Sequence, residues 1–233
     1  MYVKNRDEMI AQGNSRGREI VVDIIEAGLA AVDPYQNTRK LVRIENGKLL
    51  IGGHREMDLS GYGDEVIDLD RVGNIYVIGA GKTVQRQAKA LEDVLGDRLT
   101  AGAVTIKKGE EIVLKRIEVT EGAHPVPDEK SVEGTRKIVE IARKAGEGDL
   151  VFVLFSSGSS ALLALPPDGY SLEDVRAVCK LAIQYGDQSL IWRVMKYFSP
   201  VNSGRIVMMI HPARTIHLLM SIKGYEPWRG KIP

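Results

Sequence analysis

Short apolar runs alternate with longer amphipathic segments from residue 74 to residue 220, and this alternation constrains the fold most. The segments at residues 83–95, 129–145 and 171–185 carry apolar side chains at helical spacing. Strands that alternate with helices in this way form βαβ units around a mostly parallel sheet. The sequence therefore predicts an α/β fold with a doubly wound, Rossmann-like sheet and helices on both faces. The predicted strands cover residues 74–78, 103–106, 116–119, 150–155 and 215–220.

The N-terminal residues follow a different pattern. Residues 15–32 form a predicted amphipathic helix, which Asp33-Pro34 ends. Asn46-Gly47 then separates two apolar runs, and it predicts a β-hairpin because both positions of its two-residue turn need positive φ. We expect one domain over the whole chain, in which residues 1–70 form a helix and hairpin appendage and residues 71–233 form the core.

Composition excludes several classes of protein. Lys and Arg number 32 against 31 acidic residues, so no strong positive field is available for nucleic acid or a membrane surface. Cys179 is the only cysteine, which rules out an internal disulfide and a thiolate zinc site, and the four histidines lack metal-binding spacing. No signal peptide and no apolar run of about 18 residues is present, so we expect a soluble cytoplasmic protein.

The loops that follow the predicted strands contain much of the glycine, hydroxyl and unusual polar content. They cover residues 79–82, 121–128, 156–160 and 221–224. Because the carboxyl ends of parallel strands meet at one edge of a sheet, these loops are expected to lie together. The sequence therefore predicts a ligand site at that edge.

The first loop contains Gly79, Gly81 and Lys82, between a strand and a helix. Glycines allow the backbone to approach a phosphate, the helix N-terminus adds free N–H groups, and Lys82 adds a positive charge. The loop is not a Walker A motif, because Tyr76 stands where its first glycine belongs, and Val84 replaces the third glycine of a dinucleotide fingerprint. An anion-binding loop and a plain turn with a solvated lysine both remain open.

The loop after residues 150–155 is rich in hydroxyl groups. It reads Ser156-Ser157-Gly158-Ser159-Ser160, and it could form a nest of donors around a phosphate or carboxylate. No serine is flanked by glycines at the spacing of a Gly-x-Ser-x-Gly nucleophile elbow, which disfavours a serine hydrolase. The alternative is a helix cap with small residues that allow close packing.

Two prolines hold the third loop, residues 121–128, in a fixed path. Its His124 could donate to an anion or carry a proton. Asp128 could cap the following helix or help to hold Mg²⁺.

In these loops the sequence resembles the glycerate 2-kinase family, also described as hydroxypyruvate reductase-like. Family members show Gly-x-Gly-Lys-Ala, Gly-His-Pro-Val-Pro-Asp and Ser-Gly-Gly-Gly-Ser-Ala, and this chain has close counterparts in the same order. Lys82 matches the family's active-site lysine, and the serine loop matches its phosphate- or substrate-binding loop. Lys196 and Arg205 match basic positions in two further family motifs. The resemblance implies ATP-dependent, Mg²⁺-assisted phosphorylation of glycerate, in a cleft between this N-terminal domain and a second domain.

The chain also departs from the family pattern. Trp192, Met195 and Ile222 stand where the family has Asn, Arg and Asp, and Ser157 and Ser159 replace two glycines. The second family domain is expected to be absent. We therefore expect a kinase component, with a hydroxy acid and a nucleotide as small-molecule partners, that needs a second domain or chain. The alternative is a catalytically degenerate anion- or nucleotide-binding subunit, and a homodimer is also possible.

Overall fold

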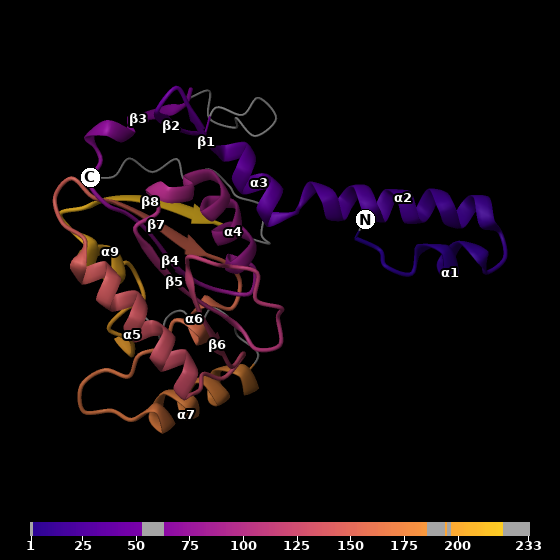
Figure 1. Cartoon of the computed structure of the whole chain (residues 1–233). Helices are drawn as coiled ribbons and strands as arrows, with labels where there is room; N and C mark the ends of the chain where they lie inside the picture. Colours follow the sequence, from indigo (N-terminus) through magenta and orange to yellow (C-terminus); the bar gives the residue numbers. More distant parts are fainter. Residues whose placement is uncertain (1, 53–62, 186–193, 195–196, 221–233) are drawn as a thin grey trace.

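The computed structural model describes residues 2–52, 63–185, 194 and 197–220 (Figure 1). The described part contains a five-stranded parallel sheet of order β6-β5-β4-β7-β8 and a three-stranded antiparallel sheet of order β1-β2-β3. The parallel strands are β4 (Ile75–Ala80), β5 (Ala101–Lys107), β6 (Glu118–Gly122), β7 (Leu150–Phe155) and β8 (Arg214–Leu219). The antiparallel strands are β1 (Val42–Glu45), β2 (Lys48–Ile51) and β3 (Glu65–Asp68).

The central strand of the parallel sheet is β4, and the chain builds outward from it in both directions. It first adds β5 and β6 on one side, then returns to add β7 and β8 on the other. The strand order therefore reverses between β4 and β7, which is the topological switch point where open α/β sheets bind ligands. The predicted doubly wound, mostly parallel α/β fold is confirmed.

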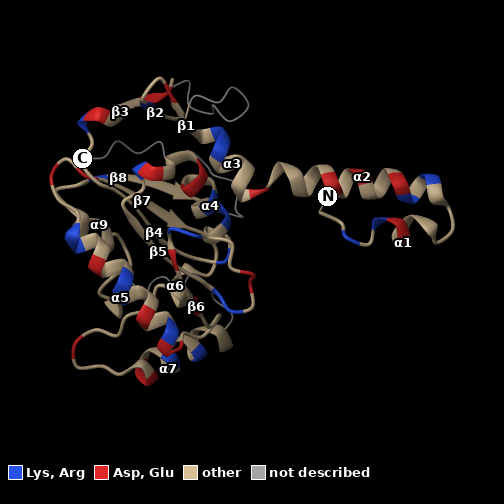
Figure 2. Ribbon diagram, in the orientation of Figure 1, with Lys and Arg blue, Asp and Glu red and all other residues tan. Residues whose placement is uncertain are grey.

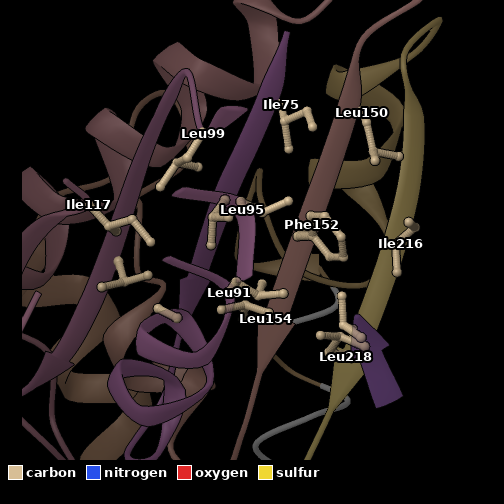
Figure 3. Close-up of a cluster of buried hydrophobic side chains, with 14 of the residues drawn as sticks. Ile75, Leu91, Leu95, Leu99, Ile117, Leu150, Phe152, Leu154, Ile216 and Leu218 are labelled. Atoms are coloured by element: carbon tan, nitrogen blue, oxygen red, sulfur yellow. The ribbon is translucent and has the colours of Figure 1, made fainter. Parts of the chain in front are cut away.

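Helices cover both faces of this sheet, as the apolar runs predict. On one face α4 (Val84–Leu95) packs on the sheet, and Figure 3 shows its Leu91 and Leu95 close to Phe152 and Leu154 of β7. On the other face α5 (Glu129–Lys144) and α9 (Arg205–Ile210) bury a second cluster that includes Ile138 and Ile206. Burial on both faces explains why β4 and β7 are almost entirely apolar.

The antiparallel sheet adds to the α4 side of the core. Val42, Leu49 and Ile67 are buried in the same cluster as the apolar face of α4. The predicted hairpin turn is confirmed, because Asn46 and Gly47 both have positive φ, at 49° and 75°. The strands β1, β2 and β3 of the appendage thus share a hydrophobic core with the parallel sheet.

At the N-terminus, α1 (Arg6–Ala11) and α2 (Ser15–Ala31) project away from the body of the molecule (Figure 1). Arg6 joins them through an ion pair of 2.7 Å with Asp23. Asp33-Pro34 was predicted only to end α2, but it also starts α3 (Pro34–Leu41), which the sequence analysis missed. The Asp33 carboxylate accepts from the amide of Gln36, as an N-cap does.

The remaining helices connect β7 to β8. The predicted capping box at Ser171 is confirmed at the start of α7 (Leu172–Gln184). The short helix α6 (Ser159–Leu162) was not predicted, nor was α9. Lys and Arg positions are interspersed with Asp and Glu positions along the ribbon (Figure 2). None of the helices in the described ranges is long and apolar enough to span a membrane.

Candidate functional site

Main-chain hydrogen bonds join the loops after β4 and β7 at the switch point. The amide of Lys82 donates to the carbonyl oxygen of Ser157 at 2.9 Å, and the amide of Gly81 donates to that of Thr105 at 3.1 Å. The first loop is therefore fixed on one side to the serine loop and on the other to β5. Both contacts lie at the carboxyl edge of the sheet.

The two glycines of the first loop are needed for this close approach. A Cβ on Gly79 would lie 2.4 Å from the carbonyl oxygen of Leu154, and one on Gly81 would lie 2.2 Å from the Ser156 hydroxyl oxygen. Gly81 also has a φ of +145°, which favours glycine. The structure thus explains Gly79 by packing against β7 and Gly81 by packing against the loop after β7. Their predicted contact with a phosphate stays a prediction.

The serine loop combines a buried cap with half-buried polar groups. Ser156 is only 5% exposed, and its hydroxyl oxygen accepts from the amide of Thr83 at 3.0 Å, at the start of α4. Gly158 has a φ of +89° and precedes α6, which Ser159 and Ser160 begin. Ser157, Gly158, Ser159 and Ser160 are half-buried, so they remain within reach of a ligand.

Gly158 lies directly against both His124 and Lys82. A Cβ on Gly158 would be 2.9 Å from Cδ2 and 3.0 Å from Nε2 of His124, and 3.2 Å from Cε of Lys82. The loops after β4, β6 and β7 therefore meet here, which confirms the predicted convergence of these segments. We call Lys82, His124 and the loop Ser156–Ser160 the edge site.

His124 lies in a positively charged environment. Burial lowers the pKa of His124 below its ordinary value of 6.5, and the positive charges of Lys82 and Lys107 lower it further. The imidazole is consequently neutral near pH 7. In that state it has one nitrogen that can accept a proton and one that can donate a hydrogen bond.

Asp128 is occupied by structural contacts. Its Oδ1 accepts from the amides of Ala123 at 3.1 Å and Ser131 at 2.9 Å, and its Oδ2 forms an ion pair of 2.5 Å with Lys108. Burial alone would raise the pKa of Asp128, but hydrogen bonds from Lys108, Ser131 and Ala123 together hold it far below its ordinary value. These contacts support the capping alternative, in which Asp128 starts α5 and braces the loop that carries His124. Its binding of substrate or phosphate stays a prediction.

Two further site residues, Lys196 and Arg205, were predicted from the family resemblance. Lys196 lies outside the described residues. Arg205 begins α9, and its guanidinium donates to the carbonyl oxygen of Asn202 at 3.3 Å. The role of both in substrate binding remains a prediction.

Sequence analysis missed Lys107, the last residue of β5. Its charge acts on His124 together with that of Lys82, although the three come from different strands. The signal was a basic residue that directly follows an apolar strand, and it lay outside the glycine- and hydroxyl-rich loops.

The fold and the edge site define a doubly wound α/β domain with a candidate anion site at its switch point. The chain belongs to the family described as "Domain of unknown function (DUF4147)", whose family model matches residues 20–222, and this is the N-terminal domain of the glycerate 2-kinase family.

Two glycerate kinases with similar sequences support this assignment. The chain is 33% identical over 208 residues to a glycerate 2-kinase of Pyrococcus horikoshii, which covers 89% of this chain and 44% of that protein. It is 35% identical to a D-glycerate 2-kinase of Thermotoga maritima, over 66% of this chain and 37% of that protein.

Solved structures agree. A protein structure from P. horikoshii matches with a TM-score of 0.71 at 32% identity, covering 88% of this chain and 43% of that one. The T. maritima glycerate kinase structure matches with a TM-score of 0.68 at 27% identity, covering 87% and 44%. The chain thus spans less than half the length of these relatives.

Proposed function

We propose that this domain supplies the phosphate-binding half of a glycerate kinase, which transfers a phosphoryl group from ATP to glycerate or a related hydroxy acid. The observation that carries the proposal is the contact of Gly158 with both His124 and Lys82 at the switch point. Loops rich in donors and positive charge at this place favour a phosphorylated ligand. The names of the relatives supply the substrate.

Each part of the edge site has a task in this reaction. The substrate hydroxyl oxygen attacks the γ-phosphorus of ATP, the bond to the bridging oxygen breaks, and ADP leaves. In the proposal Lys82 and the serine loop stabilise the charge on the transferred group, because such transfer depends mainly on positioning and electrostatics. Neutral His124 accepts the proton of the attacking hydroxyl.

The described residues do not form an all-protein Mg²⁺ site, and Mg²⁺ in nucleotide-binding enzymes is held largely by substrate phosphates and water. The described residues contain no group of three or more His, Cys, Asp or Glu side chains that could hold a metal ion. Asp128, the carboxylate that the sequence analysis considered for Mg²⁺, already has contacts to both of its oxygens. Oδ1 accepts from the amide of Ser131, and Oδ2 forms the ion pair with Lys108. Mg²⁺ remains part of the proposal for the complete enzyme only, and no step above depends on it.

A second domain or chain is proposed to complete the cleft. Among the described residues, the edge site consists of groups at one edge of the sheet. Phosphoryl transfer requires exclusion of water and charge on both sides of the phosphates. The match covers less than half of the length of these relatives, so they contain further sequence that could serve this purpose.

One observation favours the alternative, a catalytically degenerate anion- or nucleotide-binding subunit. Ser203 has a φ of 58°, a left-handed conformation, at a position where the family pattern has glycine. The backbone thus keeps a glycine conformation with a side chain added next to Arg205. Such a change favours a subunit that still binds an anion or nucleotide but has lost catalytic activity.

An ATP-consumption assay with D-glycerate distinguishes the two functions. The chain is assayed alone and together with the C-terminal half of the P. horikoshii relative, with Lys82→Met as the control. Turnover that appears only with the second half, and that Lys82→Met removes, supports the kinase proposal. No turnover under either condition, with retained binding of inorganic phosphate, supports the binding subunit instead.

A further inference from the structure

We propose that Lys107 binds the carboxylate of the hydroxy-acid substrate while Lys82 faces the phosphoryl group. This assignment rests on the proposed function. It makes Lys107 a substrate-binding residue that selects acids over neutral alcohols.

The strand register places the two lysines at the same level of the sheet edge. Ala80 pairs with Thr105, and Lys82 and Lys107 each follow these paired residues by two positions. Lys107 in turn pairs with Gly122, which precedes His124 by two positions. Neighbouring strands thus carry Lys82, Lys107 and His124 to one rim.

Strand alternation gives the side on which Lys107 emerges. Thr105 faces α5, because a Cβ on Gly134 of that helix would lie 2.3 Å from its hydroxyl oxygen. Side chains two positions apart on a strand share a face, so Lys107 points to the α5 side. Gly122 opposite it has no side chain, and the space where a Cβ would stand is filled, since that Cβ would lie 2.6 Å from the Ser131 hydroxyl oxygen.

Lys82 and Lys107 differ from the adjacent Lys108 in their ion pairing. Within the described ranges neither Lys82 nor Lys107 forms an ion pair, whereas Lys108 is paired with Asp128 at 2.5 Å. Both positive charges act on His124. An anionic ligand would supply the missing counter-charge.

Two acidic residues near Lys107 have other hydrogen-bond partners. Glu121 accepts from the amide of Gly109 at 2.9 Å, and Glu110 lies 3.4 Å from the side-chain amide of Gln85. Burial raises the pKa of Glu110 and the positive charge of Lys107 lowers it, so these two side chains interact without forming an ion pair.

Two separate cations suit a ligand with two separate anionic groups. The product of the proposed reaction carries a phosphate and a carboxylate attached to the same carbon. Lys82 lies at the start of α4 and is bonded through its amide to the serine loop, which makes it the phosphate side. Lys107 ends the neighbouring strand β5 and, within the described residues, makes no main-chain hydrogen bond to that loop, so we assign it to the carboxylate.

The test compares two probes by calorimetry on the whole chain. One is 2-phosphoglycerate, and the other is glycerol 2-phosphate, which replaces the carboxylate by a neutral hydroxymethyl group. Wild-type protein is expected to prefer 2-phosphoglycerate by about tenfold, because a charge-assisted hydrogen bond is lost with the carboxylate. Lys107→Met should abolish this preference and leave glycerol 2-phosphate affinity within about twofold. Lys82→Met should weaken both probes, and Lys144→Met, at the far end of α5, should change neither.

The outcomes separate this inference from the proposed function. If wild type prefers 2-phosphoglycerate and Lys107→Met keeps that preference, the assignment of Lys107 is overturned and the phosphate site stands. If Lys107→Met weakens both probes equally, Lys107 is a general anion contact and the carboxylate assignment is again overturned. If wild type binds neither probe, both proposals fail together. The dispersion of the amide NMR signals shows that the variant is folded, and the pKa of His124 should rise in it because the Lys107 charge is removed.

Discussion

The amide of Lys82 and the carbonyl oxygen of Ser157 form a hydrogen bond of 2.9 Å across the point where the strand order reverses. This bond joins two main-chain atoms, so it does not depend on the charge of the Lys82 side chain. The loop geometry and the charge of Lys82 can therefore be tested separately.

Lys82→Met should raise the pKa of His124 while the protein keeps its stability. The Lys82 charge disfavours the imidazolium form, so its removal makes protonation easier and shifts the His124 titration toward higher pH. An NMR titration of the histidine ring protons measures the shift, with His124→Gln used to assign the signal. The same titration in Lys144→Met should match wild type, and an unchanged pKa in Lys82→Met would show that the two side chains do not interact.

Gly158→Ala should destabilise the fold more than a glycine substitution with the same backbone strain. Gly158 and Gly169 have φ of +89° and +83°, but a Cβ on Gly158 meets His124 and Lys82, whereas Gly169 has nothing within 4 Å. Both alanine variants carry the strain of positive φ, about 1 kcal/mol or more. Only Gly158→Ala must also displace the two side chains.

Urea denaturation of both glycine variants gives the difference in unfolding free energy. We expect Gly158→Ala to be the less stable variant and to alter the NMR signals of His124. Equal stability of the two variants, with an unperturbed His124, would contradict the close contact at the edge site.

Ser156→Ala should lower the unfolding free energy by about 1–3 kcal/mol, because it leaves the amide of Thr83 without its acceptor in a buried position. Ser157→Ala is the matched control. Within the described residues the Ser157 hydroxyl forms no hydrogen bond, and its structural bond uses the main-chain carbonyl instead. Chemical denaturation should therefore separate the two variants clearly. A similar loss in both would mean that the Thr83 amide finds another partner.

The sequence predicted the fold well where the pattern is periodic. The apolar run over Leu150–Phe155 has no polar residue, and it forms a strand buried on both faces. Asn46-Gly47 predicted the hairpin because local backbone chemistry alone determines such a turn. The helices α3, α6 and α9 were missed because they are short, and tertiary packing stabilises them more than helical periodicity does.

The edge site was predictable only in part. Parallel topology placed the loops of Lys82, His124 and Ser156 at one edge, and this could be inferred before any coordinates. The register that brings Lys107 level with Lys82 could not, because pairing between strands depends on the whole sheet. The sequence also predicted Gly79 and Gly81 as phosphate-binding residues. In the structure a side chain at either position would clash with β7 or with the loop that follows it.

Asp128→Asn should make the stability of the protein less sensitive to acid. The folded-state pKa of Asp128 lies far below its ordinary value, because hydrogen bonds from Lys108, Ser131 and Ala123 outweigh the effect of burial. A lowered folded pKa means that the unfolded chain binds more protons, so this stabilisation is present above the unfolded pKa and is lost as the pH falls. In wild type the loss of stability should begin at about pH 5 and continue as the pH falls.

Asparagine still caps α5 but cannot titrate, so the variant should lose less stability below that pH. At pH 7 the variant should be less stable than wild type by about 1–2 kcal/mol, because the ion pair with Lys108 is gone. Urea unfolding at pH 7, 5 and 3 measures both effects, with Asp97→Asn as a control whose side chain is 94% exposed. Parallel stability curves for wild type and Asp128→Asn would show that the Asp128 carboxylate does not stabilise the folded state.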